Sequence, residues 1–342
     1  MSASFLHERR AGVLLHPTSL PSGRLDEDAD RWLDLLAQAG LGVWQMLPLG
    51  VPQKDLSPYQ CLSAFALNHA LFDTTAPAAV EQEDFEAWQR SQRHWLTDFA
   101  HFMVIRQEQQ CAPWYAWPEG LRLRDPDTMN AFVEVHAAAI DDVCLQQYLY
   151  HRRWHEIREL ARDRDVLLFG DMPIFIAYDS ADIWANPDQF LLNDDHEPEF
   201  VAGVPPDYFS ETGQRWGNPH FDWEQMELED FSWWMQRFAH HFDCFDIVRI
   251  DHFRGLEGVW MIPESSPTAI DGFWQKTPGD ALLTTLSRRI GELSLVAEDL
   301  GIITPEVTAL RKKFGLPGMA VLQFGFDAFD DNPHKPKNIH TD

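Results

Sequence analysis

The segment FDIVRIDHFRGLEG (residues 245–258) begins as a buried strand and then introduces charged side chains where apolar residues should continue. Because side chains alternate along a strand, Arg249 and Asp251 share one face with Ile247, while Val248 and Ile250 share the other. The apolar face is predicted to pack against helices and the charged face to point inward. Burying charge costs free energy unless the charges are paired, and function is the usual reason to accept that cost.

The composition is that of a large globular protein, with 342 residues of which 45% are hydrophobic. This length suits one large α/β barrel or two ordinary domains. The formal net charge of −27 repels phosphate backbones and anionic lipids, so we expect no nucleic-acid partner and no membrane partner. No apolar run approaches the roughly 18 residues of a membrane span, and the N-terminal stretch lacks a signal-peptide core, which predicts a cytosolic protein.

Short apolar runs, each followed by a polar or Gly/Pro-rich turn, are predicted to be strands buried on both faces. Helical patterns over residues 30–39, 131–163, 231–241, 279–292 and 304–314 lie between several of them. Strand, loop and helix repeated along a chain indicate a parallel sheet, whose closed form is a barrel. We predict an α/β fold, a (β/α)8 TIM barrel that is incomplete here. Its six predicted strands begin at Gly12, Gly42, Asp165, Phe245, Leu293 and Ala320.

Two long insertions follow predicted strands. We expect residues 48–164 to form a mainly helical subdomain and residues 172–244 to form an active-site loop region, both within a single catalytic barrel domain over residues 1–342. Insertions that follow barrel strands lie on the C-terminal face, where barrel enzymes keep their active sites.

Two further predicted strands end in inward-facing carboxylates. The alternation of side chains places Glu298 inward at the end of LSLVAEDLG and Asp171 inward at the end of DVLLFGDMP. A lone aspartate at a strand end is more often a cap or loop residue than a catalyst. Three carboxylates at one rim, however, favour a catalytic role as strongly as a cap or loop role. Tyr59 and Trp216 lie in polar, Gly/Pro-rich loops, as rings of a sugar site do.

Seven segments, in the same order along the chain, resemble the signature blocks of a known enzyme family. They are LLHPTSLPS (14–22), WQMLPLG (44–50), SPYQCLSAFALN (57–68), FGDMPIFIAYDSADIW (169–184), PPDYFSETGQRWGNPHFDW (205–223), RIDHFRG (249–255) and VAEDLG (296–301). The family is that of the amylomaltases, also called 4-α-glucanotransferases or disproportionating enzymes, a branch of the α-amylase clan. The resemblance implies a (β/α)8 barrel with inserted subdomains and no dissociable cofactor. It also implies transfer of a segment of an α-1,4-glucan, such as a maltooligosaccharide, to the 4-hydroxyl of glucose or another glucan.

The resemblance implies that Asp251 is the nucleophile and Glu298 the general acid/base. A retaining transfer places two such carboxyl groups roughly 5 to 5.5 Å apart. We expect Arg249 to keep Asp251 ionised through its opposite charge and Glu298 to have a raised pKa. The resemblance further implies a set of substrate-binding residues. They are His252 and Asp171 near the cleaved bond, Asp207, Glu211, Gln214 and Trp216 in a substrate and acceptor loop, and Ser57 and Tyr59 along the donor chain.

One block of the family is missing from the sequence. The family carries a third catalytic carboxylate in a T-G-T-H-D block after its seventh strand, whereas this sequence ends in HKPKNIHTD, and Asp342 does not belong to that block. We therefore expect the last two βα units to lie in a longer polypeptide or to be supplied by a partner.

Two other functions are compatible with the sequence. A hydrolase of the same clan would share the barrel and the acid pair, and an inactive glucan-binding fragment would bind without turnover. A metal enzyme fits poorly, because HEIRE at His155 lacks the second histidine of H-E-x-x-H and NDDHE at Asn193 lacks the spacing of a calcium loop. The four scattered cysteines, Cys61, Cys111, Cys144 and Cys244, are predicted to be reduced, buried thiols.

Overall fold

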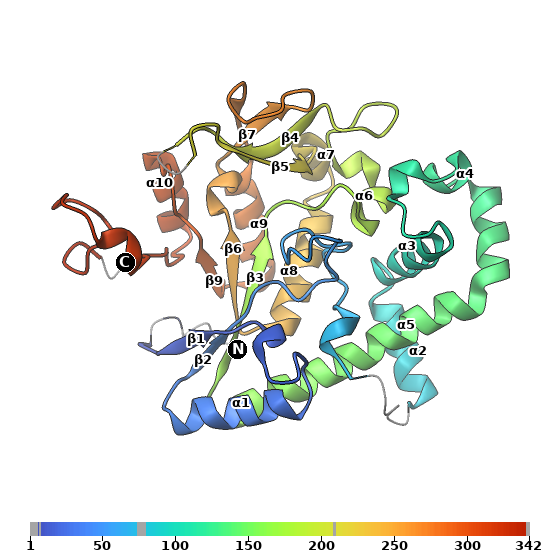
Figure 1. Cartoon of the computed structure of the whole chain (residues 1–342), viewed down its shortest axis with the longest axis horizontal. Coiled ribbons are helices and arrows are strands. Elements are labelled where there is room, and N and C mark those ends of the chain that lie inside the picture. The colour runs from blue at the N-terminus through green and yellow to red at the C-terminus, as the bar shows by residue number, and fades with distance from the viewer. Residues whose placement is uncertain (1–5, 7, 74–79, 208–209, 340–342) are drawn as a thin grey trace.

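The computed structural model describes residues 6, 8–73, 80–207 and 210–339. At its centre is a parallel sheet with the strand order β1-β2-β3-β6-β9 (Figure 1). The strands are β1 (Gly12–Leu14), β2 (Val43–Gln45), β3 (Leu167–Pro173), β6 (Ile247–Asp251) and β9 (Leu295–Ala297). Every neighbouring pair is parallel, so the carboxyl ends of these strands meet at one edge of the sheet.

The first five predicted strands are confirmed, and the prediction of a sixth at Ala320 is wrong. The chain reaches β9 at Pro317, whose carbonyl accepts a hydrogen bond of 2.9 Å from the Ala297 N–H. The Met319 N–H then donates to the Asp299 carboxylate at 2.8 Å, which turns the backbone away from the sheet. Residues Leu322–Gly325 consequently form an exposed 3-10 helix. Asp342 lies outside the described residues.

All five helical patterns of the sequence form helices. They correspond to α1 (Glu27–Gln38), α5 (Pro126–Asp163), α8 (Ser232–Cys244), α9 (Gly279–Ile290) and α10 (Pro305–Lys313). Helix α5 begins with Asp125 as N-cap, which accepts a hydrogen bond from the Thr128 N–H, and with proline at its first position. It bends at His136, whose backbone angles are not helical.

The two long insertions hold most of the remaining elements. Between β2 and β3 lie α2 (Gln82–Ser91), α3 (Leu96–Glu108) and α4 (Glu119–Arg122), together with α5. Between β3 and β6 lie α6 (Ala181–Ala185), β4 (Phe200–Val204), β5 (Gln214–Pro219) and α7 (Trp223–Leu228), followed by α8. Strands β7 (Gly258–Pro263) and β8 (Phe273–Lys276), which lie between β6 and β9 in the sequence, complete a second, antiparallel sheet with the order β5-β4-β7-β8. The division of the chain into a barrel and inserted subdomains stays a prediction.

Helix α5 is tied to the turn that precedes β6. The Trp154 indole N–H donates to the Cys244 carbonyl at 2.9 Å. The Arg158 guanidinium donates to the carbonyls of Phe242 and Phe245, each at 3.1 Å, and to that of Asp243. Because buried carbonyls are costly when unsatisfied, these bonds fix the amino end of β6 against α5.

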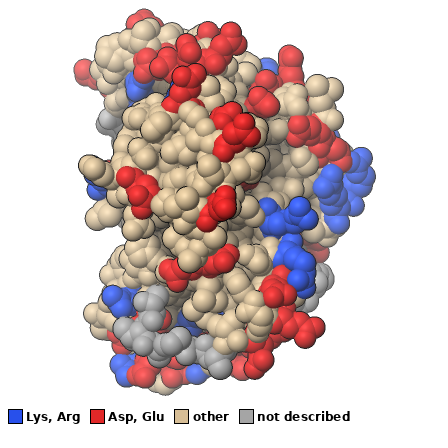
Figure 2. All heavy atoms as spheres, turned by 90° about the vertical axis from the view of Figure 1, so that its right-hand side faces the viewer, with Lys and Arg blue, Asp and Glu red and all other residues tan. Residues whose placement is uncertain are grey.

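Acidic side chains dominate the surface, as expected for 54 Asp and Glu against 27 Lys and Arg. On the face shown in Figure 2 they are widely spread, whereas the basic side chains gather mainly along one edge. Among the described helices, none is both long and apolar enough to cross a membrane.

Gly170 lies where β3 passes the Phe245 ring, and we predict that it tolerates no side chain. A Cβ at this position would lie 2.4 Å from a ring carbon of Phe245, which is itself buried and packed against Trp154. Gly170→Ala should therefore lower the free energy of unfolding by about 1 to 3 kcal/mol, the usual cost of overpacking a core. The midpoint of urea unfolding measures this change.

The matched control repeats the Gly170→Ala substitution in a Phe245→Ala background. Alanine at position 245 lacks the Cγ, Cδ2 and Cε2 atoms that would clash, so Gly170→Ala should cost less there than in the parent protein. An equal cost in both backgrounds would show that the Phe245 ring does not exclude a side chain at Gly170.

Candidate active site

The carboxyl ends of three adjacent strands bring the predicted charged residues together. The register pairs Asp171 of β3 with Arg249 of β6, and Arg249 with Val296 of β9. Asp251 ends β6, and Glu298 directly follows β9. Parallel pairing thus places all four side chains at one edge of the sheet.

Arg249 joins two of the carboxylates. Its Nε and Nη2 donate to the two oxygens of Asp171, each at 2.9 Å, in a bidentate pair. Its Nη2 also donates to Oδ1 of Asp251 at 2.6 Å. The Tyr59 hydroxyl donates to Asp171 Oδ2 at 2.8 Å and accepts a bond from Arg249 at 3.2 Å. One guanidinium therefore orients both aspartates, with Tyr59 as a further contact.

Glu298 is held by backbone groups. Its carboxylate accepts hydrogen bonds from the His252 N–H at 2.8 Å and from the Leu300 N–H at 3.1 Å. His252 adopts a left-handed backbone conformation, with φ of 52°, which is unfavourable for a residue with a Cβ. Such strain is characteristic of functional sites, and here it accompanies the N–H bond to the Glu298 carboxylate.

Burial controls the proton affinity of the carboxyl groups. It raises the pKa of Asp251 to about 7, an effect increased by the negative charges of Asp171 and Glu298 and opposed by Arg249. Burial also raises the pKa of Glu298, the direction that a general acid requires, against the opposing effect of Arg249. The expected effect of Arg249 on Asp251 has the predicted sign but is smaller than that of burial.

Two cavities meet at Asp251. One, of about 750 Å³, is lined by Ser57, Tyr59, Gln214, Trp216 and His252, among others. The other, of about 320 Å³, is lined by Asp207, Gln214, Trp216, Arg249, His252 and Glu298, among others. The Trp216 ring meets the His252 ring edge to face at 4.9 Å, which places the β5 segment beside the end of β6.

Glu211 is the predicted site residue that stands apart. Its side chain is exposed in the turn before β5, and it lines neither of these cavities. Asp207, from the same loop, accepts a hydrogen bond from the Ser210 N–H at 2.9 Å.

Two aromatic groups of the cavities were not predicted from the sequence. Tyr115 and Tyr178 stack with ring centroids 4.8 Å apart and line the larger cavity. Trp274 lines the smaller one, with the Arg254 guanidinium 3.8 Å from its ring centroid. Arg254 belongs to the RIDHFRG segment, which was a usable signal, whereas the two tyrosines come from separate insertions and no sequence spacing joins them. Among the described residues, no cluster of three or more His, Cys, Asp or Glu side chains could hold a metal ion.

Comparison with known proteins identifies the family of the chain. The model of the family described as 4-alpha-glucanotransferase matches residues 14–82 and 69–342. The chain belongs to this family. It is 41% identical to the 4-alpha-glucanotransferase of Thermus thermophilus over 96% of the chain and 75% of that protein. It is 39% identical to the enzyme of the same name from Synechocystis sp., over 97% of the chain and 76% of that protein.

Solved structures of the 4-alpha-glucanotransferase family share the fold. Amylomaltase from Streptococcus agalactiae, solved in complex with acarbose, superposes with a TM-score of 0.92 at 30% identity, over 97% of this chain and 77% of that one. Amylomaltase from Corynebacterium glutamicum gives a TM-score of 0.75 at 18% identity, which shows the fold alone. The family resemblance and the fold class predicted from the sequence are confirmed, and the relatives carry the name of the transferase and not that of the hydrolase.

Arg249 should set the acidic limb of the pH profile. Its positive charge lowers the pKa of Asp251. In Arg249→Gln that pKa should rise, so the ionised form of Asp251 is lost at a higher pH and the acidic limb of kcat/KM moves upward. Activity should also fall by roughly 10²-fold or more, because one electrostatic contact at a reacting centre is removed. Transfer rates measured across the pH range test both effects.

Tyr59→Phe is the matched control for Arg249→Gln. It removes a neighbouring hydrogen bond without changing the charge beside Asp251, so its acidic limb should stay close to that of the parent enzyme. An unmoved limb in Arg249→Gln would show that Arg249 does not govern the ionisation of Asp251.

Proposed function

We propose that this chain acts as a 4-α-glucanotransferase by a retaining double displacement. The observation that carries the proposal is the pairing of Asp251, bonded to Arg249, with Glu298, bonded to two backbone N–H groups, at neighbouring strand ends. Family membership supports the same reaction. The donor is a maltooligosaccharide or another α-1,4-glucan, and the acceptor is glucose or a second glucan.

The first step forms a glycosyl-enzyme. An Asp251 oxygen attacks the anomeric carbon while the bond from that carbon to the leaving 4-oxygen breaks, and Glu298 donates its proton to that oxygen. In the second step the 4-hydroxyl of the acceptor loses its proton to Glu298 and attacks the same carbon, and Asp251 leaves as a carboxylate. Two inversions retain the α-configuration.

The electrostatics of the carboxyl pair suit this exchange. Glu298 carries a proton before the first step, gives it up in that step, and regains a proton from the acceptor in the second step. The negative charge of Glu298 is one of the causes that raise the pKa of Asp251, so the pair disfavours the state in which both are ionised. The productive form has the proton on Glu298, with Arg249 bound to the ionised Asp251.

The surroundings of the pair favour a sugar acceptor over water. Trp216 and Gln214 line both cavities beside Asp251, and we assign them with Asp207 to substrate and acceptor binding. Glu211 lines neither cavity, and its assignment to the same role rests on the family resemblance alone. Ser57 and Tyr59 line the larger cavity and are assigned to the donor chain. His252 lines both cavities and is assigned to a hydroxyl near the cleaved bond, as is Asp171, which lines neither cavity and contacts Arg249. A sugar stacked over the ring of Trp216 excludes water from the glycosyl-enzyme.

The enzyme that contains this chain should disproportionate maltotriose. We expect glucose and maltooligosaccharides longer than maltotriose, because the glycosyl-enzyme passes its sugar to a second glucan. Chromatography of the products after incubation with maltotriose tests this. If only shorter sugars form, with reducing ends rising in step, the protein is a hydrolase and the proposal fails.

Substitution of the two carboxylates should have different effects on the reaction. Asp251→Asn removes the nucleophile, so no glycosyl-enzyme should form from any substrate. Glu298→Gln should retain partial attack on an α-glycosyl fluoride, because fluoride leaves with little help from an acid. Rates on maltotriose and on the fluoride are compared for both variants. Equal losses on both substrates in both variants would contradict the assignment of roles.

A further inference from the structure

Arg237 is a buried cation directly behind the site. Arg237 lies on α8 and is 1% exposed. Its guanidinium donates to the carbonyl of Ile174 at 3.1 Å and to that of Pro173. Pro173 is the last residue of β3, the strand that carries Asp171, and it is the register partner of Asp251 in β6. Ile174 follows it directly. Arg237 therefore holds the end of β3, which carries one aspartate and pairs with the other.

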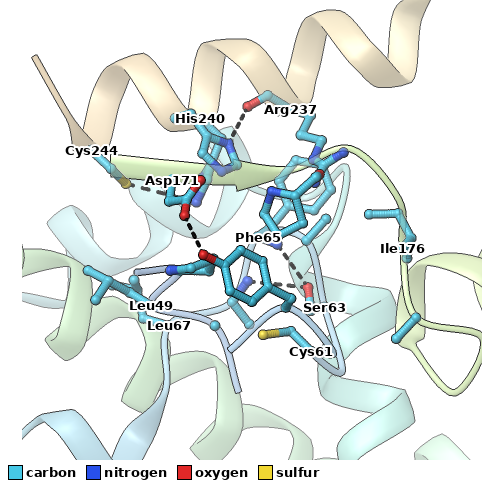
Figure 3. A pocket seen from close by; sticks show the side chains of 18 of the residues that line it. Leu49, Cys61, Ser63, Phe65, Leu67, Asp171, Ile176, Arg237, His240 and Cys244 are labelled. Carbon is cyan, nitrogen blue, oxygen red and sulfur yellow. Dashed lines mark hydrogen bonds between the residues drawn. The ribbon is translucent and has the colours of Figure 1, made fainter. Parts of the chain in front are cut away.

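The strand end has open space on this side. Arg237, Asp171, Tyr59 and His240 line a cavity of about 60 Å³ between α8 and the segment around Phe65 (Figure 3). This volume exceeds that of a single water, so packing alone leaves the end of β3 partly unsupported. The hydrogen bonds of Arg237 replace part of that support.

Burying the charge of Arg237 costs free energy. Among the described residues no carboxylate lies within ion-pair distance of it, and its Nε has no hydrogen-bond partner. The negative charge of buried Asp182 offsets only part of the effect of burial, which lowers the pKa of Arg237. Its guanidinium carbon lies 5.5 Å and 5.1 Å from the ring centroids of Trp233 and Trp234. A buried charge of this kind is often less favourable than an apolar side chain of similar size. Packing alone therefore does not explain an arginine at this position.

We propose that Arg237 is a positioning residue for the reaction. By binding the carbonyls of Pro173 and Ile174, it holds the Asp171 carboxylate in its bidentate contact with Arg249, and through Arg249 it orients Asp251. This inference rests on the proposed function of the carboxylate pair. Arg237 lines neither of the two cavities that meet at Asp251, so it influences the reaction only through β3.

Arg158 offers a matched control at the other end of the sheet. It too is a buried arginine that donates to several backbone carbonyls, those of Phe242, Asp243 and Phe245, although it also contacts the Asp246 carboxylate at 3.2 Å. Arg237→Met and Arg158→Met should both lower the midpoint of urea unfolding. Only Arg237→Met should lower kcat/KM for maltotriose, by about 10²-fold, the cost of displacing reacting groups by about 1 Å.

A double-mutant cycle tests the route through Asp171. If Arg237 acts by holding Asp171, then Arg237→Met should cost much less in an Asp171→Asn background than in the parent, because the contact it supports is already weakened. Arg158→Met should have the same small effect in both backgrounds. Arg237→Lys, which keeps the charge and can bind a carbonyl, should recover part of the activity, and it replaces Arg237→Met in the cycle if that variant does not fold.

Two outcomes would overturn the inference. The first is a kcat/KM of Arg237→Met equal to that of Arg158→Met. The second is a loss of kcat/KM from Arg237→Met that is the same in the parent and in the Asp171→Asn background. Acarbose binding, measured by calorimetry, separates this failure from failure of the proposed function. A parent protein that binds acarbose but transfers no glucan would refute the proposed function. The inference then still requires weaker acarbose binding in Arg237→Met than in Arg158→Met, and equal binding would refute it.

Discussion

The bidentate pair between Arg249 and Asp171 is the contact on which the rest of the site depends. It spans two neighbouring strands, and the same guanidinium holds Asp251 at 2.6 Å. The parallel register places these side chains opposite each other, so the sheet itself supplies the alignment. Burial raises the pKa of both Asp251 and Glu298 and Arg249 opposes it, while for Asp251 the negative charges of Asp171 and Glu298 add to the effect of burial. In the proposed mechanism, this raised proton affinity retains the proton that glycosyl transfer needs.

The backbone supports this arrangement as much as the side chains do. Glu298 is held by N–H groups of His252 and Leu300, and the left-handed conformation of His252 accompanies the first of these bonds. Backbone donors have little freedom to rotate, so they fix a carboxylate more firmly than a flexible side chain would. The strain at His252 is the cost of that rigidity, and the surrounding hydrogen bonds sustain it.

The sequence predicted what depends on local periodicity. Alternation along residues 245–258 placed Arg249 and Asp251 on one face, and the register confirms that Arg249 faces Asp171. It did not predict that the segment at Ala320 would turn away, because that depends on a hydrogen bond from Met319 to the distant Asp299. The stacking of Tyr115 on Tyr178 was equally hidden. For Asp251 the sign of the Arg249 effect was predictable, but the larger effect of burial follows only from the surrounding fold.

The acidic surface bears on how a glucan is recognised. A net charge of −27 repels anions and attracts cations, yet a glucan is neutral, so long-range electrostatic steering contributes little to its encounter with the enzyme. Recognition must then come from short-range contacts, namely hydrogen bonds to hydroxyls and the stacking of sugars on rings such as Trp216 and Tyr115, which line the larger cavity. In the proposed mechanism the charges of the site act instead on the reacting carbon. Binding and chemistry are thus assigned to different side chains, aromatic and amide groups along the cavity and carboxylates at the strand ends.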